Sequence, residues 1–89
     1  MEFAAHVDWR SEKFGAVIFD TLNEKVYVTN ETGNDILRLI EDGLDVAAIV
    51  DRLQAQYVAE PPDMRPDVEA FVEQLGANGV LSSVEKEHS

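Results

Sequence analysis

The side chains that could carry out catalysis are few and scattered along this chain of 89 residues. His6 and His88 lie near opposite ends and lack the i, i+4 spacing with which a helix presents two metal ligands. There is no cysteine, which excludes a thiol nucleophile and a thiolate metal site. Ser11, Ser82 and Ser83 have no glycine-rich elbow and no base nearby in sequence, and the glycines are isolated from one another. We therefore expect no enzyme activity, no metal and no cofactor.

Acidic residues dominate the charge, with 18 Asp and Glu against 7 Lys and Arg, a net charge of −11. In such a composition neighbouring carboxylates are expected, and we interpret them as a solvated surface. The cations are scattered from Arg10 to Lys86, whereas nucleic-acid binding needs clustered Lys and Arg to neutralise phosphates. The charge instead favours a neutral or basic protein or peptide partner.

The length and the hydropathy pattern predict one small domain. No apolar run approaches the ~20 residues that span a bilayer, and residues 1–6 lack the basic start and apolar stretch of a signal peptide. We expect a single domain over residues 1–89, with a core of about 6–81 and a polar tail at 82–89, in the cytoplasm and without membrane contact.

The first part of the chain has the pattern of a β-sheet. Phe14–Phe19 is a short apolar run with β-branched and aromatic residues, and Lys25–Thr29 alternates between two faces. Turn-forming residues at 20–24 separate them, which predicts an antiparallel hairpin. His6–Arg10 also alternates and can add a third strand. Because an isolated hairpin is marginal in water, an apolar element must cover one face.

The rest of the chain predicts three helices. The first spans about Thr32–Glu41 and follows Asn30, whose side chain can cap a helix. The second follows the cap Asp45, with apolar residues at helical spacing as far as Tyr57. The third has Pro66 in its first turn, where a missing amide donor does no harm, and it stops at Gly79. We predict an α+β, winged-helix-like fold, in which a three-stranded antiparallel sheet is followed by three helices.

Three segments occur in an order that resembles a known family. A strand leads through Tyr27–Gly33 into the first helix, Asp42-Gly43 precedes the amphipathic helix Val46–Leu53, and Asp67–Leu75 runs into Asn78–Leu81. Together they resemble the PqqD-like family, the recognition elements of ribosomally made, modified peptides. The resemblance covers roughly Phe14–Leu81, and Asn30-Glu31-Thr32-Gly33 is its most specific part. The compact approach to this motif departs from PqqD proper, so the pathway stays open between a quinone cofactor, a sactipeptide-like product and a lasso peptide.

The resemblance implies a function without catalytic residues. Family members bind the leader of a precursor peptide as a strand added to their third strand, beside the third helix. They present the precursor to a modifying enzyme, often a radical SAM maturase, or in the lasso branch a leader peptidase and cyclase. Carried onto this chain, the implied peptide-binding residues are Lys25, Val26, Tyr27, Val28, Asp67, Val68, Phe71 and Leu75.

Strand addition also has a physical basis, because an edge strand presents unpaired N–H and C=O groups that another chain can complete. We expect Val26, Val28, Val68, Phe71 or Leu75 to line a groove for one or two apolar side chains. At least two apolar residues of the third helix are nevertheless expected to be buried core. Two other hypotheses remain. One is a small winged-helix DNA-binding regulator, against which the missing basic helix argues; the other is a structural module that dimerises through the third strand, so that monomer and homodimer are both open.

Overall fold

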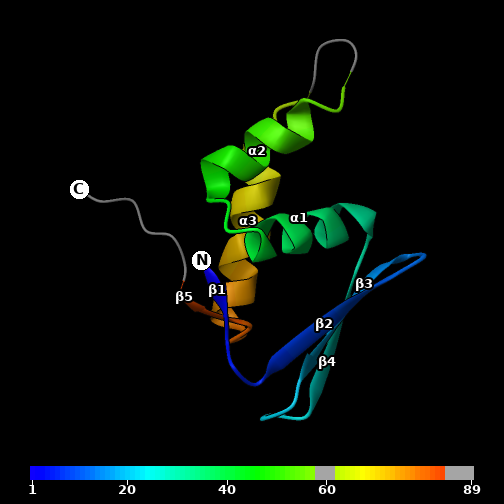
Figure 1. The fold of residues 1–89 in the computed structure, drawn as a ribbon, viewed down its shortest axis with the longest axis vertical. Coiled ribbons are helices and arrows are strands. Elements are labelled where there is room, and N and C mark those ends of the chain that lie inside the picture. The colour runs from blue at the N-terminus through cyan, green and yellow to red at the C-terminus, as the bar shows by residue number, and fades with distance from the viewer. Residues whose placement is uncertain (58–61, 84–89) are drawn as a thin grey trace.

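The computed structural model describes residues 1–57 and 62–83, and its main elements follow the predicted order of strands and then helices (Figure 1). The elements are β1 (Glu2–Phe3), β2 (Val7–Glu12), β3 (Gly15–Asp20), β4 (Lys25–Thr29), α1 (Glu31–Glu41), α2 (Val46–Gln54), α3 (Arg65–Ala77) and β5 (Leu81–Ser83). The main sheet has the order β2-β3-β4 and is antiparallel throughout, which confirms the predicted α+β fold. In the described part of the chain no helix is long and apolar enough to cross a membrane.

The main sheet has one covered and one uncovered face. Ala16 and Ile18 of β3 are fully buried, and β3 contacts α1 on this inner face. On β4, Val26 and Val28 are 59% and 66% exposed, and they lie opposite Phe19 and Val17 of β3 on the outer face. Helix α1 therefore packs against the inner face, while Val26 and Val28 stay exposed on the outer face.

Side-chain caps fix where the first two helices begin, as the sequence predicts. The Asn30 carboxamide oxygen accepts a hydrogen bond from the Gly33 N–H at 2.9 Å, and the Asp45 carboxylate accepts one from the Ala48 N–H at 2.9 Å. Each bond satisfies one of the amide groups that a helix start leaves unpaired. The cap at Asn30 also makes α1 begin directly after β4, so that the strand and the helix are joined by this one residue.

The start of the chain and β5 form a second sheet that the sequence pattern did not predict. β1 and β5 pair antiparallel with Phe3 opposite Leu81, and the Ala4 N–H donates to the Val80 carbonyl at 2.9 Å (Figure 1). Strands of two and three residues are too short to show an alternating pattern. The expected core of about 6–81 therefore omits β1 and ends at the first residue of β5, and residues 84–89 of the expected tail lie outside the described residues.

The second helix is shorter than the apolar spacing suggests. It ends at Gln54, after which the N–H groups of Gln56 and Tyr57 each donate at 3.2 Å to a carbonyl only three residues earlier. These tighter turns take the chain out of the helical path, and Tyr57 is 48% exposed instead of continuing the apolar face.

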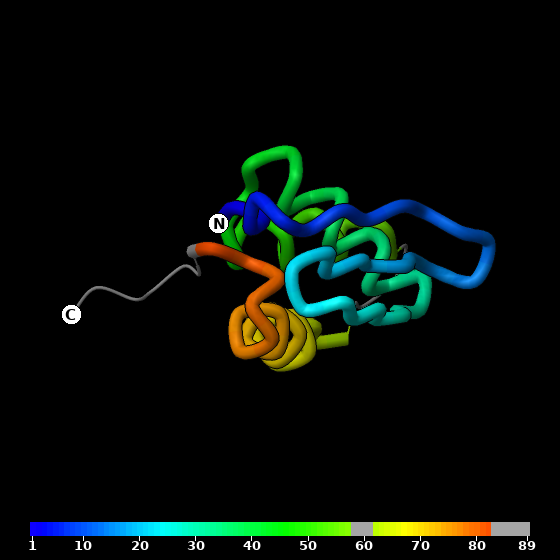
Figure 2. The backbone as a smooth tube through the Cα atoms, turned by 90° about the horizontal axis from the view of Figure 1, so that it is seen from below, coloured from blue at the N-terminus to red at the C-terminus, as the bar shows by residue number. Residues whose placement is uncertain are grey.

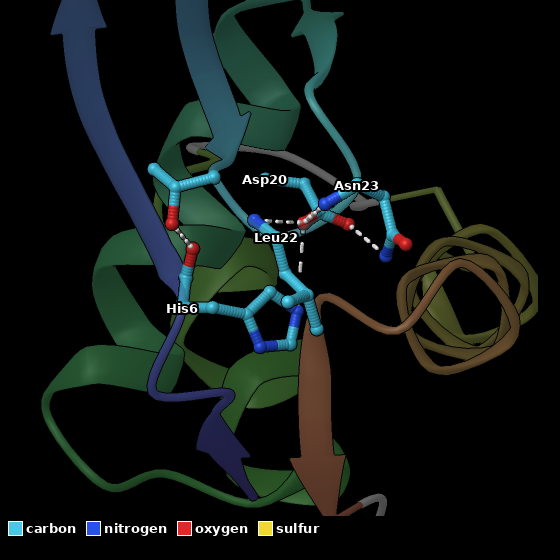
Figure 3. A network of polar contacts seen from close by, with 5 residues as sticks. His6, Asp20, Leu22 and Asn23 are labelled. Atoms are coloured by element: carbon cyan, nitrogen blue, oxygen red, sulfur yellow. Dashed lines mark hydrogen bonds and ion pairs between the residues drawn. The ribbon is translucent and has the colours of Figure 1, made fainter.

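A buried carboxylate holds the turn between β3 and β4 (Figure 3). Asp20 is 2% exposed, and its carboxylate accepts hydrogen bonds from the Asn23 side chain at 3.0 Å and from the N–H groups of Asn23 and Leu22 at 2.9 and 3.1 Å. The side-chain bond from Asn23 is the largest cause that lowers the pKa of Asp20, followed by the Asn23 N–H; burial opposes them, and His6, 3.6 Å away, adds to the lowering. The turn that starts β4 is thus fixed by an ionised side chain.

We expect Asp20→Asn to destabilise the protein at pH 7 and the loss to shrink in acid. The folded-state pKa of Asp20 lies below its ordinary value of 3.8, so ionised Asp20 stabilises the fold fully above about pH 5, and this contribution is lost as the pH falls through the folded-state pKa. Urea unfolding followed by Trp9 fluorescence between pH 7 and pH 3 measures the difference. A difference that stays constant over this range contradicts the prediction.

Asn23→Ala removes the side-chain hydrogen bond that lowers the pKa of Asp20 most, so this variant should raise the pKa of Asp20 in an NMR titration.

Candidate functional site

The outer edge of β4 is open in the described chain. β4 pairs with β3 on one side, and the strand order β2-β3-β4 places no strand on its other side. β5, which comes after α3, pairs with β1 instead. The edge that the family resemblance assigns to a peptide is therefore not covered by any described strand.

A hydrogen bond at the end of the sheet shows which residue pairs of β2 and β3 are hydrogen-bonded. The Thr21 N–H donates to the His6 carbonyl at 3.0 Å, one step beyond the last pair of β2 and β3. Hydrogen-bonded pairs alternate with non-hydrogen-bonded pairs in an antiparallel ladder. Counting by two from Thr21, Phe19 and Val17 therefore point their N–H and C=O groups toward β2. Ile18 lies between them and points its N–H and C=O toward β4.

Two residues of β4 consequently present their backbone groups at the open edge. Tyr27 lies opposite Ile18, so its N–H and C=O face β3. Val26 and Val28, on either side of Tyr27, direct their N–H and C=O groups away from the sheet. These are the groups that an added strand would pair with.

A hollow of about 200 Å³ lies between β4 and α3, and we call it the β4 hollow. Figure 2 shows the backbone of α3 beside the end of the sheet where β3 turns into β4. The β4 hollow is lined by Ile18, Tyr27, Val28, Thr29, Phe71, Gln74, Leu75, Asn78 and Val80. Its volume is below the roughly 300–1,000 Å³ of small-molecule pockets, so it suits one or two side chains better than a whole ligand.

A second hollow, of about 390 Å³, is lined by Phe71 and by residues at the start of α1. We call it the α1 hollow. It is lined by Asn30, Thr32, Gly33, Ile36, Tyr57, Pro62, Asp63, Met64, Asp67 and Phe71. Phe71 lines both hollows, so they adjoin at this residue, and we call the two hollows together the groove.

Gly33 allows Phe71 to take this position. A Cβ atom at Gly33 would lie 2.6 Å from the Thr29 Cβ and 3.2 Å from a carbon of the Phe71 ring. Only glycine therefore lets β4, α1 and α3 approach one another at this point. This contact gives a physical reason for the glycine in the Asn30–Gly33 motif.

The structure brings five of the eight predicted site residues to the groove. Tyr27, Val28, Phe71 and Leu75 line the β4 hollow, and Asp67 lines the α1 hollow. Lys25 and Val26 belong to β4 but line neither hollow.

The expected apolar lining differs from the observed one in two ways. Val68 is 0% exposed and belongs to the core, so it is not accessible to a peptide. Val26 and Val28 carry their side chains on the exposed outer face, although Val28 is also among the residues that line the β4 hollow. The reason is the register: Tyr27 lies opposite the buried Ile18, so the other set of β4 side chains faces the groove.

Gln74 and Asn78 line the groove but were not among the predicted residues. Their spacing from Phe71 could have identified them. Phe71, Gln74 and Asn78 follow one another at intervals of three and four residues and thus share a helix face. An apolar pattern does not include carboxamides, and for that reason they were missed.

The groove combines an open strand edge with partly apolar walls. In the described ranges, 1–57 and 62–83, no three His, Cys, Asp or Glu side chains are placed to hold a metal ion. Asp67 lies in the first turn of α3, where a negative charge is favourable, and the nearby Arg65 is paired with Glu69 at 3.0 Å. What the arrangement provides is an unpaired strand edge beside two partly apolar hollows.

Residues 15–81 match the family described as coenzyme PQQ synthesis protein D (PqqD). The chain belongs to the PqqD family. Two relatives from Rhodopseudomonas palustris, strains ATCC BAA-98 / CGA009 and TIE-1, are called PqqA binding protein and are 37% and 36% identical over 59 residues. Each match covers 66% of this chain and 58% of the relative, so it spans less than two thirds of those relatives' own length.

Solved structures with the same fold include two small proteins with bound peptides. TbiB1 in complex with the TbiA(beta) leader peptide superposes on this chain with a TM-score of 0.84 at 21% sequence identity. The match covers 97% of this chain and 100% of the TbiB1 chain. Lasso peptide synthetase B1 complexed with the leader peptide has a TM-score of 0.80 at 23% identity, with coverages of 92% and 96%. At these identities the likeness establishes that this PqqD-family chain shares their fold.

We expect Gly33→Ala to destabilise the protein by about 1–3 kcal/mol, as overpacking usually does. The added methyl group would overlap Thr29 and press on the Phe71 ring, which outweighs the ~1 kcal/mol that alanine gains over glycine in a helix. Urea unfolding measures the loss, and altered NMR shifts of the Phe71 ring would show where the strain falls. Thr32→Ala, an exposed change in the same turn, is the control; equal stability of the two variants contradicts the prediction.

Proposed function

We propose that this protein is a non-catalytic peptide-binding protein that receives the leader segment of a ribosomally made precursor as a strand on β4. The observation that carries the proposal is the open edge of β4, where Val26 and Val28 present unpaired backbone groups beside the β4 hollow. Membership of the PqqD family supports it, as do curated relatives that are named for binding PqqA.

Strand addition separates affinity from selectivity. Main-chain hydrogen bonds to Val26 and Val28 form with any peptide sequence that can extend, whereas side chains on alternate residues enter the hollows. Tyr27, Phe71 and Leu75 give the β4 hollow apolar walls, so we propose that the leader places an apolar side chain there. The net charge of −11 adds a preference for a leader that is neutral or basic.

Presentation to an enzyme completes the proposal. We propose a radical SAM maturase as the partner that modifies the bound precursor, with a leader peptidase and cyclase as the alternative in a lasso pathway. Both act in the cytoplasm, where a ribosomal precursor is made. Purifying the tagged protein with each enzyme encoded beside its gene, with and without the precursor, distinguishes the two.

Hydrogen exchange of the β4 amides tests strand addition directly. The probes are synthetic PqqA of Rhodopseudomonas palustris and the peptides encoded by short reading frames beside the gene for this protein. Without peptide we expect the Val26 and Val28 amides to exchange rapidly, and with saturating peptide to slow by about tenfold or more, since each gains a hydrogen bond. Tyr27, whose amide already faces β3, is the matched control on the same strand and should be protected in both states.

Three outcomes would contradict the proposal. The first is that none of the probes binds, and the second is that a probe binds without slowing Val26 and Val28. The third is that these amides become protected without peptide as the protein concentration rises, because a second copy would then occupy the edge.

A proline at the open edge provides an independent prediction. Val28→Pro removes one outward N–H, and proline is tolerated on edge strands where that N–H does not face the neighbouring strand. We expect peptide binding by isothermal titration calorimetry to weaken about tenfold or more while the circular dichroism spectrum is retained. Val28→Thr keeps the N–H and the β-branched shape, so it should bind as the wild type does. Equal loss in both variants would place the effect in the side chain instead of the backbone.

A further inference from the structure

A peptide strand added to β4 has backbone N–H and C=O groups along two edges, and β4 can hydrogen-bond the groups of only one edge. In a strand the backbone groups of alternate residues point to opposite sides. If one set pairs with Val26 and Val28, the other set points away from β4, toward the side on which α3 borders the groove. A backbone group that loses water there without finding a partner would weaken binding by about tenfold.

Gln74 and Asn78 stand where partners for that second edge are needed. Gln74 of α3 and Asn78, the residue that caps the end of α3, both line the β4 hollow, as do Tyr27 and Thr29 of β4. Each carboxamide has two N–H donors and one carbonyl acceptor, so it can complete either kind of backbone group. Within residues 1–57 and 62–83 neither carboxamide has a hydrogen-bond partner, so both are available to a ligand.

The spacing of the two carboxamides matches that of a strand. The Asn78 N–H donates to the Gln74 carbonyl at 3.0 Å, which shows that the helix is regular between them. Four residues of α-helix advance by about 6 Å. Backbone groups on one edge of a strand recur every two residues, about 6.4–6.8 Å apart. A peptide that runs along the groove can therefore meet both carboxamides with successive groups of the same edge.

We infer that Gln74 and Asn78 hydrogen-bond the main chain of the bound peptide on the edge opposite β4. The inference rests on the proposed function and adds a second set of main-chain contacts to it. Recognition then depends on the peptide backbone along both edges, and the choice of sequence is left to the side chains that enter the two hollows. Neither residue has a role in the core, because both are exposed on the surface of α3.

Substitutions that keep the size of each side chain test the inference. Gln74→Met and Asn78→Leu remove the polar groups, and we expect each to raise the Kd for the tightest probe peptide by about three- to tenfold. Gln56→Met makes the same chemical change at an exposed residue outside both hollows and should leave the Kd unchanged. Wild-type affinity in the Gln74 and Asn78 variants would overturn the inference.

Amide-to-ester replacements along the probe peptide identify the groups involved. An ester lacks the N–H, and replacing consecutive amides samples the two edges in turn. On the edge paired with β4, an ester should weaken binding equally to the wild type and to the Gln74→Met, Asn78→Leu double variant. On the other edge it should weaken binding to the wild type but not to the double variant. An ester on this other edge that weakens binding to the double variant as much as to the wild type would overturn the inference.

Hydrogen exchange separates this inference from the function on which it rests. If the Val26 and Val28 amides are protected by peptide while the α3 variants bind normally, strand addition stands and the second set of contacts is refuted. If the peptide leaves those amides unprotected, the proposed function itself fails.

Discussion

The unpaired edge of β4 is the feature on which the groove depends, and it is a hazard to the protein that carries it. Such an edge can pair with another copy as readily as with a ligand. Three features of the chain limit that risk. β4 has only five residues, Lys25 begins it, and the net charge of −11 makes two copies repel each other at close range. Under the proposed function, a peptide of opposite charge meets no such repulsion, so the same charge that discourages self-pairing favours that ligand.

The edge can bind well only if it is fixed before a ligand arrives, and both ends of β4 are anchored. At its start, ionised Asp20 holds the turn through Asn23 and Leu22. At its end, Asn30 caps α1 directly, and Gly33 permits contact with Phe71. Helix α3 is placed independently by its core residue Val68. Strand and helix are thus held at a set separation, and a peptide would not have to order them, which lowers the entropic cost of binding.

The fold was largely predictable from the sequence, whereas the details of the groove were not. Caps and apolar spacing located the helices because Asn30 and Asp45 act within one turn of the chain. The alternation on β4 predicted two faces but could not show which of them is covered. The reason is that β3 is apolar on both faces, with Ile18 on the inner and Phe19 on the outer. The β1–β5 pairing joins the chain's start to the segment after α3, and no local pattern records such a contact. Gln74 and Asn78 were not predicted, because in a sequence the polar residues of a groove cannot be distinguished from other exposed polar residues.

Phe71 gives the groove a property that neither hollow has alone. If the leader binds along β4, its side chains toward the groove recur every two residues, about 6.4–6.8 Å apart. Phe71 lines both the β4 hollow and the α1 hollow, so two anchoring side chains of the leader, one in each hollow, must be spaced to fall on either side of it. Because main-chain contacts are indifferent to sequence, this spacing becomes the information that distinguishes one extended peptide from another. Selectivity then resides in the distance between two anchors as well as in their identity, and Gly33 contributes to it by leaving room for the Phe71 ring.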